Sequence, residues 1–383
     1  MAERLPLDVA IVGGGPVGLA LASLLALRGI NVAVFEQRRS TGTHTRAIGI
    51  HPPGLRVLER IGVAADLTAR GVRIQRGEAV SGGRRIASLS FSTLPGAYPY
   101  VLAVPQPVTQ GVLEDRLERL APGALHRSAR ITGVDAGSHC VTLTGMDDGG
   151  PLTVHSRLLV GADGPQSTVR ELAGIGFRSR GYPDHYLMGD FPDGTGSDAA
   201  VLHLSPAGIV ESFPLPGATR RWVARMPGPV PRPSAAQLAG IIATRTGVAV
   251  DHHRHTMLSS FGVEARLANA MVSGRVALIG DAAHQISPIG GLGMNLGWLD
   301  AESLAPIIGA ALAGEPTGAA LAAFQRSRLA AARRAMRHSE LNMRLGRPMP
   351  GPVLDARNAV VSALMGLPAV HQSLARRFTM ATH

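Results

Sequence analysis

The first half of the chain alternates short apolar runs with turn-forming residues. Asp8–Val12 and Asn31–Phe35 are rich in β-branched residues, as is typical of buried parallel strands. Between them, Leu19–Arg28 has the pattern of a helix that ends at a glycine. Arg157–Val160 and Arg275–Ile279 are two further apolar runs of the same kind. This pattern predicts an α/β fold built on a parallel sheet.

A different pattern follows in the middle of the chain. Short strands separated by Gly, Pro and Asp are expected at Tyr186–Phe191, Ala200–Leu204, Gly208–Phe213 and Arg221–Met226. Regular spacing with turn signals favours a mainly antiparallel sheet, and Val72–Phe91 is expected to add strands to it. Ser234–Thr246 is predicted to be a helix.

The C-terminal third is predicted to be helical. Ala319–Leu341 should form a long helix, and Leu354–Phe378 an amphipathic segment kinked at Gly366 and Pro368. The segment is expected to cap the fold. Contact of its basic end with a membrane surface is the alternative.

These patterns predict a Rossmann-type domain with an inserted, mainly antiparallel β-sheet substrate domain and C-terminal helices. The expected Rossmann-type domain is discontinuous and comprises residues 1–71, 101–180 and 270–345. The substrate domain comprises residues 72–100 and 181–269, and a C-terminal helical segment comprises residues 346–383.

Charge and cysteine content exclude several classes of protein. The net charge is +11 and all 38 basic residues are arginine, but they are scattered, which argues against a nucleic-acid surface. Cys140 is the single cysteine, so we expect no internal disulfide and a cytoplasmic protein. His252, His253 and His255 lack further ligands at suitable spacing, so no metal site is expected. No apolar run is long and unbroken enough for a membrane span.

The turn after the first predicted strand carries a nucleotide-binding pattern. Gly13-Gly14-Gly15-Pro16-Val17-Gly18 matches G-x-G-x-x-G, and Glu36 follows the second strand. Gly13 would permit the tight turn, Gly15 the approach of a pyrophosphate, and Gly18 close packing of helix on strand. The helix N-terminus would hold the phosphates, and Glu36 the ribose hydroxyls. The unit predicts dinucleotide binding without separating FAD from NAD.

Two later segments place carboxylates at strand ends. Gly161-Ala-Asp163-Gly164 follows one apolar strand and leads into a helix that starts at a serine. Gly280-Asp281 follows another, and the glycine-rich stretch Gly290–Asn295 comes next. Open α/β sheets bind ligands at such carboxyl ends, and the amides of a helix N-terminus suit negative charge.

The three segments together resemble the class A flavin-dependent monooxygenases, the p-hydroxybenzoate hydroxylase-like flavoproteins. The resemblance implies that the glycine turn binds the ADP part of FAD, that Asp281 contacts the ribityl chain, and that the Leu292–Asn295 amides face the flavin. Pro288 would line the site where oxygen reacts. Arg46 matches a family arginine that contacts FAD.

Val104-Pro105-Gln106 resembles a segment of the phenol and aromatic-polyketide hydroxylases. Gln110 departs from the Glu or Arg found there in relatives, which weakens a cofactor role for it. The C-terminal thioredoxin-like domain of that subgroup is not expected here. The residues expected to bind FAD are Gly13, Gly15, Pro16, Val17, Gly18, Glu36, Gln37, Arg46, Gln106, Asp163, Asp281, Gly291, Leu292, Gly293, Met294 and Asn295.

The resemblance implies a monooxygenase that consumes NADPH or NADH as a transient reductant and hydroxylates an aromatic substrate with O₂ through a flavin C4a-hydroperoxide. Epoxidation, Baeyer–Villiger oxidation, reduction and non-catalytic flavin binding are alternatives. The protein is expected to be a monomer or homodimer.

Candidate pocket residues come from the middle strands. His203, Phe213, Trp222 and Arg225 are the expected substrate contacts, with Tyr186 and Met188 as further candidates; packing in a core is the alternative for each. His51, His203 and His284 are candidate general bases, with His284 expected to support the flavin loop instead.

Overall fold

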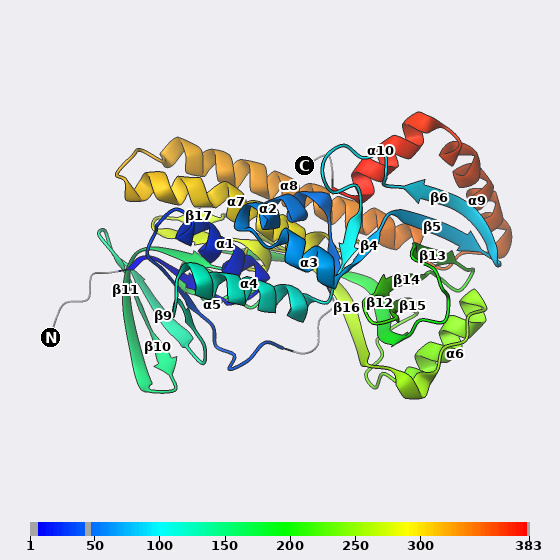
Figure 1. The fold of residues 1–383 in the computed structure, drawn as a ribbon, viewed down its shortest axis with the longest axis horizontal. Coiled ribbons are helices and arrows are strands. Elements are labelled where there is room, and N and C mark those ends of the chain that lie inside the picture. Colours follow the sequence, from blue (N-terminus) through cyan, green and yellow to red (C-terminus); the bar gives the residue numbers. More distant parts are fainter. Residues whose placement is uncertain (1–6, 43–46, 381–383) are drawn as a thin grey trace.

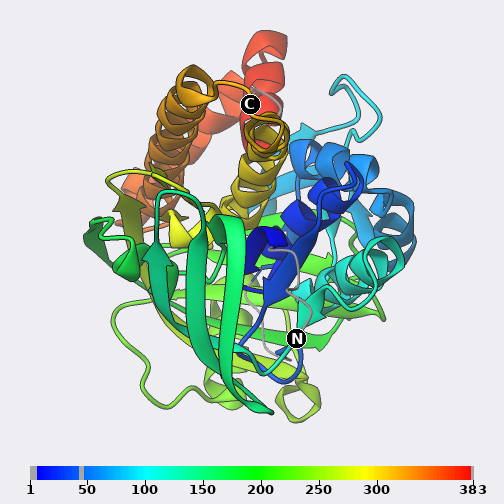
Figure 2. The same ribbon diagram turned by 90° about the vertical axis from the view of Figure 1, so that its left-hand side faces the viewer.

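The computed structural model describes residues 7–42 and 47–380. Two eight-stranded sheets and a three-stranded sheet form its frame. The first sheet, with β9–β11, lies at one end of the long axis, and the second sheet with helix α6 lies at the other (Figure 1). Long helices run along one side of both (Figures 1 and 2).

The first sheet has the order β17-β18-β11-β1-β2-β8, and β10 and β9 extend from β11. Its core is parallel from β18 to β8, because helices return the chain between these strands. The strands are β1 (Leu7–Val12), β2 (Val32–Phe35), β8 (Leu125–His126), β9 (Arg130–Ala136), β10 (Val141–Asp147), β11 (Gly150–Gly161), β17 (Val272–Ser273) and β18 (Val276–Leu278).

Helices pack on this sheet and on one another. Helix α1 is buried along most of its length, which explains why its sequence is apolar on all sides. The helices are α1 (Pro16–Ala26), α2 (Pro52–Ile61), α3 (Ala64–Arg70), α4 (Gln106–Leu120), α5 (Thr168–Leu172), α7 (Leu292–Leu312) and α8 (Gly318–Leu345). Helices α7 and α8 lie side by side and cover the sheet (Figure 2).

The second sheet has the order β19-β16-β12-β15-β14-β13-β5-β6, and only its β13–β5 pair is parallel. Its strands are β5 (Arg76–Ser81), β6 (Arg84–Ser90), β12 (Phe177–Pro192), β13 (Ala200–Leu204), β14 (Val210–Leu215), β15 (Thr219–Met226), β16 (Met257–Ala268) and β19 (His284–Gln285). Helix α6 (Ala235–Thr246), capped by Ser234, covers one face. The 3₁₀ turn η1 (His252–Arg254) follows.

One strand expected in this sheet lies elsewhere. β4 (Val72–Ile74) joins β3 (Gly49–Ile50) and β7 (Val101–Ala103) in the three-stranded sheet. The prediction that all of Val72–Phe91 extends the second sheet is therefore wrong for β4 and right for β5 and β6.

The C-terminal segment bends where the sequence predicted. Helices α9 (Gly351–Met365) and α10 (Pro368–Phe378) meet at 104° and pack on β6. In the part of the chain described, no single helix could cross a membrane by length and hydropathy, although this bent pair passes both criteria jointly. The predicted fold class, a Rossmann-type unit with an inserted antiparallel sheet and C-terminal helices, is confirmed.

A buried ion-pair cluster fastens the second sheet to the chain after α8. Asp184, fully buried on β12, accepts hydrogen bonds from Arg225 Nε of β15 at 3.2 Å and from Arg347 Nη2 at 2.7 Å. Burial alone would raise the pKa of Asp184, but the two guanidinium groups hold it below its usual value.

We expect Asp184→Asn to lower the free energy of unfolding by roughly 3 kcal/mol, because it leaves two arginines without their counter-ion. Chemical denaturation measures this difference. Asp198→Asn is the matched control, since Asp198 is 69% exposed and its pair with Arg76 should contribute little. Equal stabilities of the two variants would contradict the proposed role of the cluster.

Candidate functional site

The three glycine-containing motifs meet at the carboxyl ends of adjacent parallel strands. β18, β11 and β1 pair in that order, and each runs directly into one motif loop. Backbone hydrogen bonds join the loops: Ala162 N donates to Val12 O, and Ile279 N donates to Gly161 O. Strand register therefore brings the motifs together, as the fold type requires.

The glycine turn after β1 has the geometry that its sequence predicts. Gly13 has φ 110°, and a Cβ there would lie 2.3 Å from Ala162 O. A Cβ on Gly18 would lie 2.0 Å from Gly13 O, so glycine is required for helix α1 to approach the strand. At Gly15 nothing lies within 4 Å, and no side chain caps α1. The turn thus presents open space and free amides to a pyrophosphate.

Glu36 follows β2 and braces the same turn. Its carboxylate accepts hydrogen bonds from Gly14 N and Arg38 N, each at 2.8 Å. A carboxylate has about four acceptor positions, so ribose hydroxyls can still bind it. Gln37 is exposed and is not among the residues that line the central cavity.

Asp163 stabilises its own loop. Its two oxygens accept hydrogen bonds from Ser167 Oγ at 2.5 Å and from Val169 N at 3.1 Å, at the start of α5. Burial raises the pKa of Asp163, and these hydrogen bonds oppose the change. Ala162 and Gly164 line the cavity, whereas Asp163 does not. The structure therefore gives Asp163 a positioning role at the start of α5, and its direct contact with the cofactor stays a prediction.

Asp300 of α7 holds the loop after β18. Its buried carboxylate accepts hydrogen bonds from Gly280 N at 3.0 Å, His284 Nε2 at 2.5 Å and Arg328 Nε at 2.6 Å. Burial lowers the pKa of His284, but Asp300 outweighs it and the net shift is upward. His284 is therefore an ion-paired support of the loop, as the sequence analysis expected, and not a free base.

Asp281 lies in the 3₁₀ turn η2 (Gly280–Ala282) and lines the cavity. Its side chain is accessible from the cavity although protein surrounds it, and this burial raises its pKa. A ligand in the cavity would therefore contact the Asp281 carboxyl directly. Ribityl hydroxyls are suitable donors to such a carboxylate.

The glycine-rich stretch ends at the N-terminus of α7. Gly290 and Gly291 have φ of 94° and 65°, and no side chain caps the helix. Asn295 anchors the turn: its side chain accepts from His51 N at 2.8 Å and donates to Gly49 O at 3.0 Å. The free amides of the first turn therefore remain for a ligand with partial negative charge.

His51 supports the same turn. Its Nε2 lies 3.1 Å from Gly290 O, and burial lowers its pKa to about 4. The ring is neutral at pH 7, and no partner for Nδ1 is found among the described residues.

A cavity of about 1060 Å³ opens between these loops and the second sheet. This is at the upper end for small-molecule sites, which suits a cofactor ring together with a substrate. Of the expected site residues, those that line it are Gly15, Pro16, Val17, His51, Gln106, Asp281, Pro288, Gly291, Gly293, Met294, Met188 and Phe213. Leu292 does not line it, and Arg46 lies outside the described residues.

Three of the substrate contacts expected on the second sheet do not line this cavity. His203 and Trp222 stack on each other at 5.7 Å, and Trp222 packs in the core under α6, on the face away from the cavity. Arg225 is engaged by Asp184. Tyr186 is buried against Phe261 and does not line the cavity. Phe213 and Met188 do line it.

Sequence reasoning missed several wall residues. Glu211 lies two positions before Phe213 on β14 and on the same face, so the period of two in a strand would have found it. Gln110, for which the sequence analysis weakened a cofactor role, also lines the cavity, and its Nε2 donates to Gly14 O at 3.0 Å. Arg357 of α9 and Phe378 of α10 also line the cavity.

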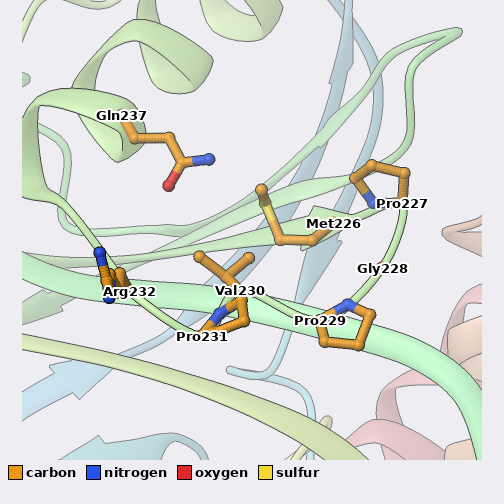
Figure 3. A pocket seen from close by; sticks show the side chains of 8 residues that line it. All are labelled: Met226, Pro227, Gly228, Pro229, Val230, Pro231, Arg232 and Gln237. Carbon is orange, nitrogen blue, oxygen red and sulfur yellow. The ribbon is translucent and has the colours of Figure 1, made fainter.

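A separate depression of about 610 Å³ lies on the loop after β15 (Figure 3). It is lined by Met226–Arg232 and Gln237, and contains none of the motif residues. Over the described ranges, no group of three or more His, Cys, Asp or Glu residues that could hold a metal ion is found.

Comparison with known proteins agrees with this geometry. Residues 6–339 match the FAD binding domain family. An uncharacterized aromatic compound monooxygenase of Bacillus subtilis is 32% identical over 88% of this chain and 68% of its own length. A 6-methylpretetramide 4-monooxygenase of Streptomyces rimosus is 33% identical over 78% of this chain and 55% of its own.

Among solved structures, p-nitrophenol 4-monooxygenase of Pseudomonas putida superposes with a TM-score of 0.86 at 25% identity, covering 97% of both chains. Anhydrotetracycline hydroxylase of Streptomyces rimosus gives 0.79 at 27% identity, covering 98% of this chain and 76% of its own. The chain belongs to the FAD binding domain family and is a class A flavin-dependent monooxygenase, as the sequence resemblance implied.

Replacing Gly15 by Ala should separate cofactor binding from folding. The new Cβ meets no protein atom but projects into the space for the pyrophosphate, so we expect at least about tenfold weaker FAD binding with little loss of stability. Gly18→Ala is the matched variant, in which the clash with Gly13 O should destabilise the apoprotein by about 3 kcal/mol. Fluorescence titration with FAD and thermal melts measure both. Wild-type FAD affinity in Gly15→Ala would refute this account of the turn.

Glu211 gives stability a specific pH dependence. Burial raises its pKa from 4.5 to about 7, so the folded state loses stability as pH rises through that range. We expect Glu211→Gln to match the wild type at pH 4 and to exceed it by about 3 kcal/mol above pH 8. Chemical denaturation at both pH values tests this. Glu315→Gln, exposed between α7 and α8 and outside the cavity, is the matched control. A pH-independent difference for Glu211→Gln would show that the carboxyl is not buried in this way.

Proposed function

We propose that this chain is an FAD-dependent, NAD(P)H-consuming monooxygenase that hydroxylates an aromatic, phenolic or polyketide-like small molecule with O₂. The supporting observation is one continuous cavity with the three nucleotide-motif loops on one side and the second sheet on the other. Relatives named for aromatic and polyketide substrates support the substrate class.

The residues divide into two groups. Residues 1–71, 101–180 and 270–345 would bind FAD, with Gly15–Val17 at the pyrophosphate, Glu36 at the ribose, Gln106 and Asp281 along the ribityl chain, and the α7 N-terminus at the ring. Residues 72–100 and 181–269 would hold the substrate. Bound FAD, reduced by NAD(P)H, would supply oxygen activation at its C4a position.

This chain supplies orientation and exclusion of water. The substrate wall is mostly apolar, with Leu202, Val223 and Phe213 of the sheet facing Pro288 and Met294 of the flavin loop across one cavity. An apolar, shaped cavity favours oxygen transfer to a bound ring over reaction with water.

The test is the visible spectrum of the purified protein, followed by NADPH and NADH oxidation and O₂ uptake with and without a panel of phenols and aromatic polyketides. We expect a flavin spectrum, substrate-stimulated oxidation and a product heavier by one oxygen atom from labelled O₂. A product that gains hydrogen and no oxygen would identify a reductase. FAD binding without NAD(P)H-dependent reduction would identify a non-catalytic flavoprotein, and either result would overturn the proposal.

A further inference from the structure

A transverse row of side chains crosses the cavity wall of the second sheet. Strand register places seven residues next to one another along it, from β6 to β16. In order they are Ala87, Ala79, Leu202, Glu211, Val223, Met188 and Ser259, and all seven line the cavity. Glu211 is the ionisable member at the centre of this row.

The carboxyl of Glu211 has no hydrogen-bond donor or ion-pair partner among the described residues. The residue is 8% exposed, and this remaining exposure faces the cavity that it lines. Its strand neighbours Val210 and Ser212 face the other way, where Val210 joins the core under α6 and Ser212 Oγ accepts from Arg220. Burying a carboxyl in an apolar wall without a hydrogen-bond partner costs free energy. This indicates that a bound ligand supplies the missing partner.

The charged groups on the neighbouring strands are engaged elsewhere. On β15, Arg221 is bound by Asp190 through two contacts of 2.7 Å, and Arg225 is bound by Asp184. On β12, Tyr186 has a buried hydroxyl without a partner, and burial followed by the charge of Glu211 raises its pKa.

The remaining groups packed near β14 are also occupied or face away. His203 of β13 stacks on Trp222, Arg73 of β4 lies over Tyr100, Arg245 of α6 donates to Arg225 O, and Arg357 of α9 donates to Leu345 O. β7 contributes no charged residue. Burial is therefore the dominant influence on Glu211 and raises its pKa to about 7, the range suited to a general base.

We propose that Glu211 binds and deprotonates a phenolic hydroxyl of the substrate. This inference rests on the proposed hydroxylase function. The phenolic O–H bond breaks, its proton passes to a Glu211 oxygen, and its electron pair drives an ortho or para ring carbon to form the new C–O bond. The oxygen atom comes from O₂, whose second atom leaves as water with two electrons from NAD(P)H. The ring then loses its C–H proton, and Glu211 releases the proton that it accepted.

The test is a binding measurement that requires no turnover. Equilibrium dialysis of the oxidised holoprotein would compare 1-naphthol, a phenol that stays protonated in solution from pH 6 to pH 8, with its methyl ether. We expect wild-type affinity for 1-naphthol to rise about tenfold over this range, as a hydrogen bond to an ionised carboxylate forms. Affinity for the ether should not change.

Glu211→Gln should bind both probes with pH-independent affinities within about twofold of each other. Glu315→Gln, exposed between α7 and α8 and outside the cavity, should behave as wild type. FAD content verifies folding, and Glu211→Asp provides a second variant that should retain a weakened pH dependence. The proposal would be overturned if Glu211→Gln kept the wild-type, pH-dependent preference for 1-naphthol over its methyl ether. It would also be overturned if the wild type showed no such preference. If only the proposed hydroxylase function were wrong, the protein would still bind 1-naphthol in preference to its ether but would show no NAD(P)H-dependent O₂ uptake.

Discussion

The site depends on one buried carboxylate. Asp300 of α7 binds Gly280 N, His284 and Arg328, and so fixes the loop after β18 to the helix that covers the sheet. Removing a carboxylate of this kind would leave two cationic partners buried, so its position is strongly enforced. Neighbouring links extend the constraint: Arg170 Nη1 donates to Ala282 O, and Trp298 Nε1 donates to Pro16 O. The three motif loops therefore form one preorganised unit.

Preorganisation leaves the binding groups available. The side chains that hold the loops in place, such as Asn295 and His51, make hydrogen bonds within the chain. The backbone amides at the starts of α1 and α7, in contrast, have no N-cap side-chain hydrogen bond. This division explains how a cofactor site can be rigid and still present free donors to phosphate and flavin oxygens. The opposite wall is mostly apolar, and Glu211 differs from its neighbours there because none of the described residues pairs with its carboxyl.

Much of this could be predicted from sequence, because strand period, glycine spacing and the acids at strand ends are local signals. Gly13 and Gly18 have the structural roles that their spacing predicted, and the space beside Gly15 is open, although its contact with a pyrophosphate stays a prediction. Asp281 faces the cavity, as its place at a strand end predicted.

The failures have a common cause. Which face of a strand meets the cavity depends on where α6 packs, so the sequence could not decide between a substrate contact and core packing for Trp222 and His203. The role of Arg225 depends on Asp184, a partner distant in sequence. The isolation of Glu211 is equally invisible in the sequence, since it results from the pairing of the nearby described arginines with other groups.

The most direct measurement of the central claim is the affinity of the apoprotein for FAD in wild type and Asp300→Asn. An asparagine can accept from Gly280 N but cannot neutralise His284 and Arg328, so the loop should lose its fixed position. We expect at least about tenfold weaker FAD binding in a variant that keeps the far-UV circular dichroism of the wild type. Wild-type FAD affinity in folded Asp300→Asn would contradict the claim that this buried carboxylate organises the cofactor site.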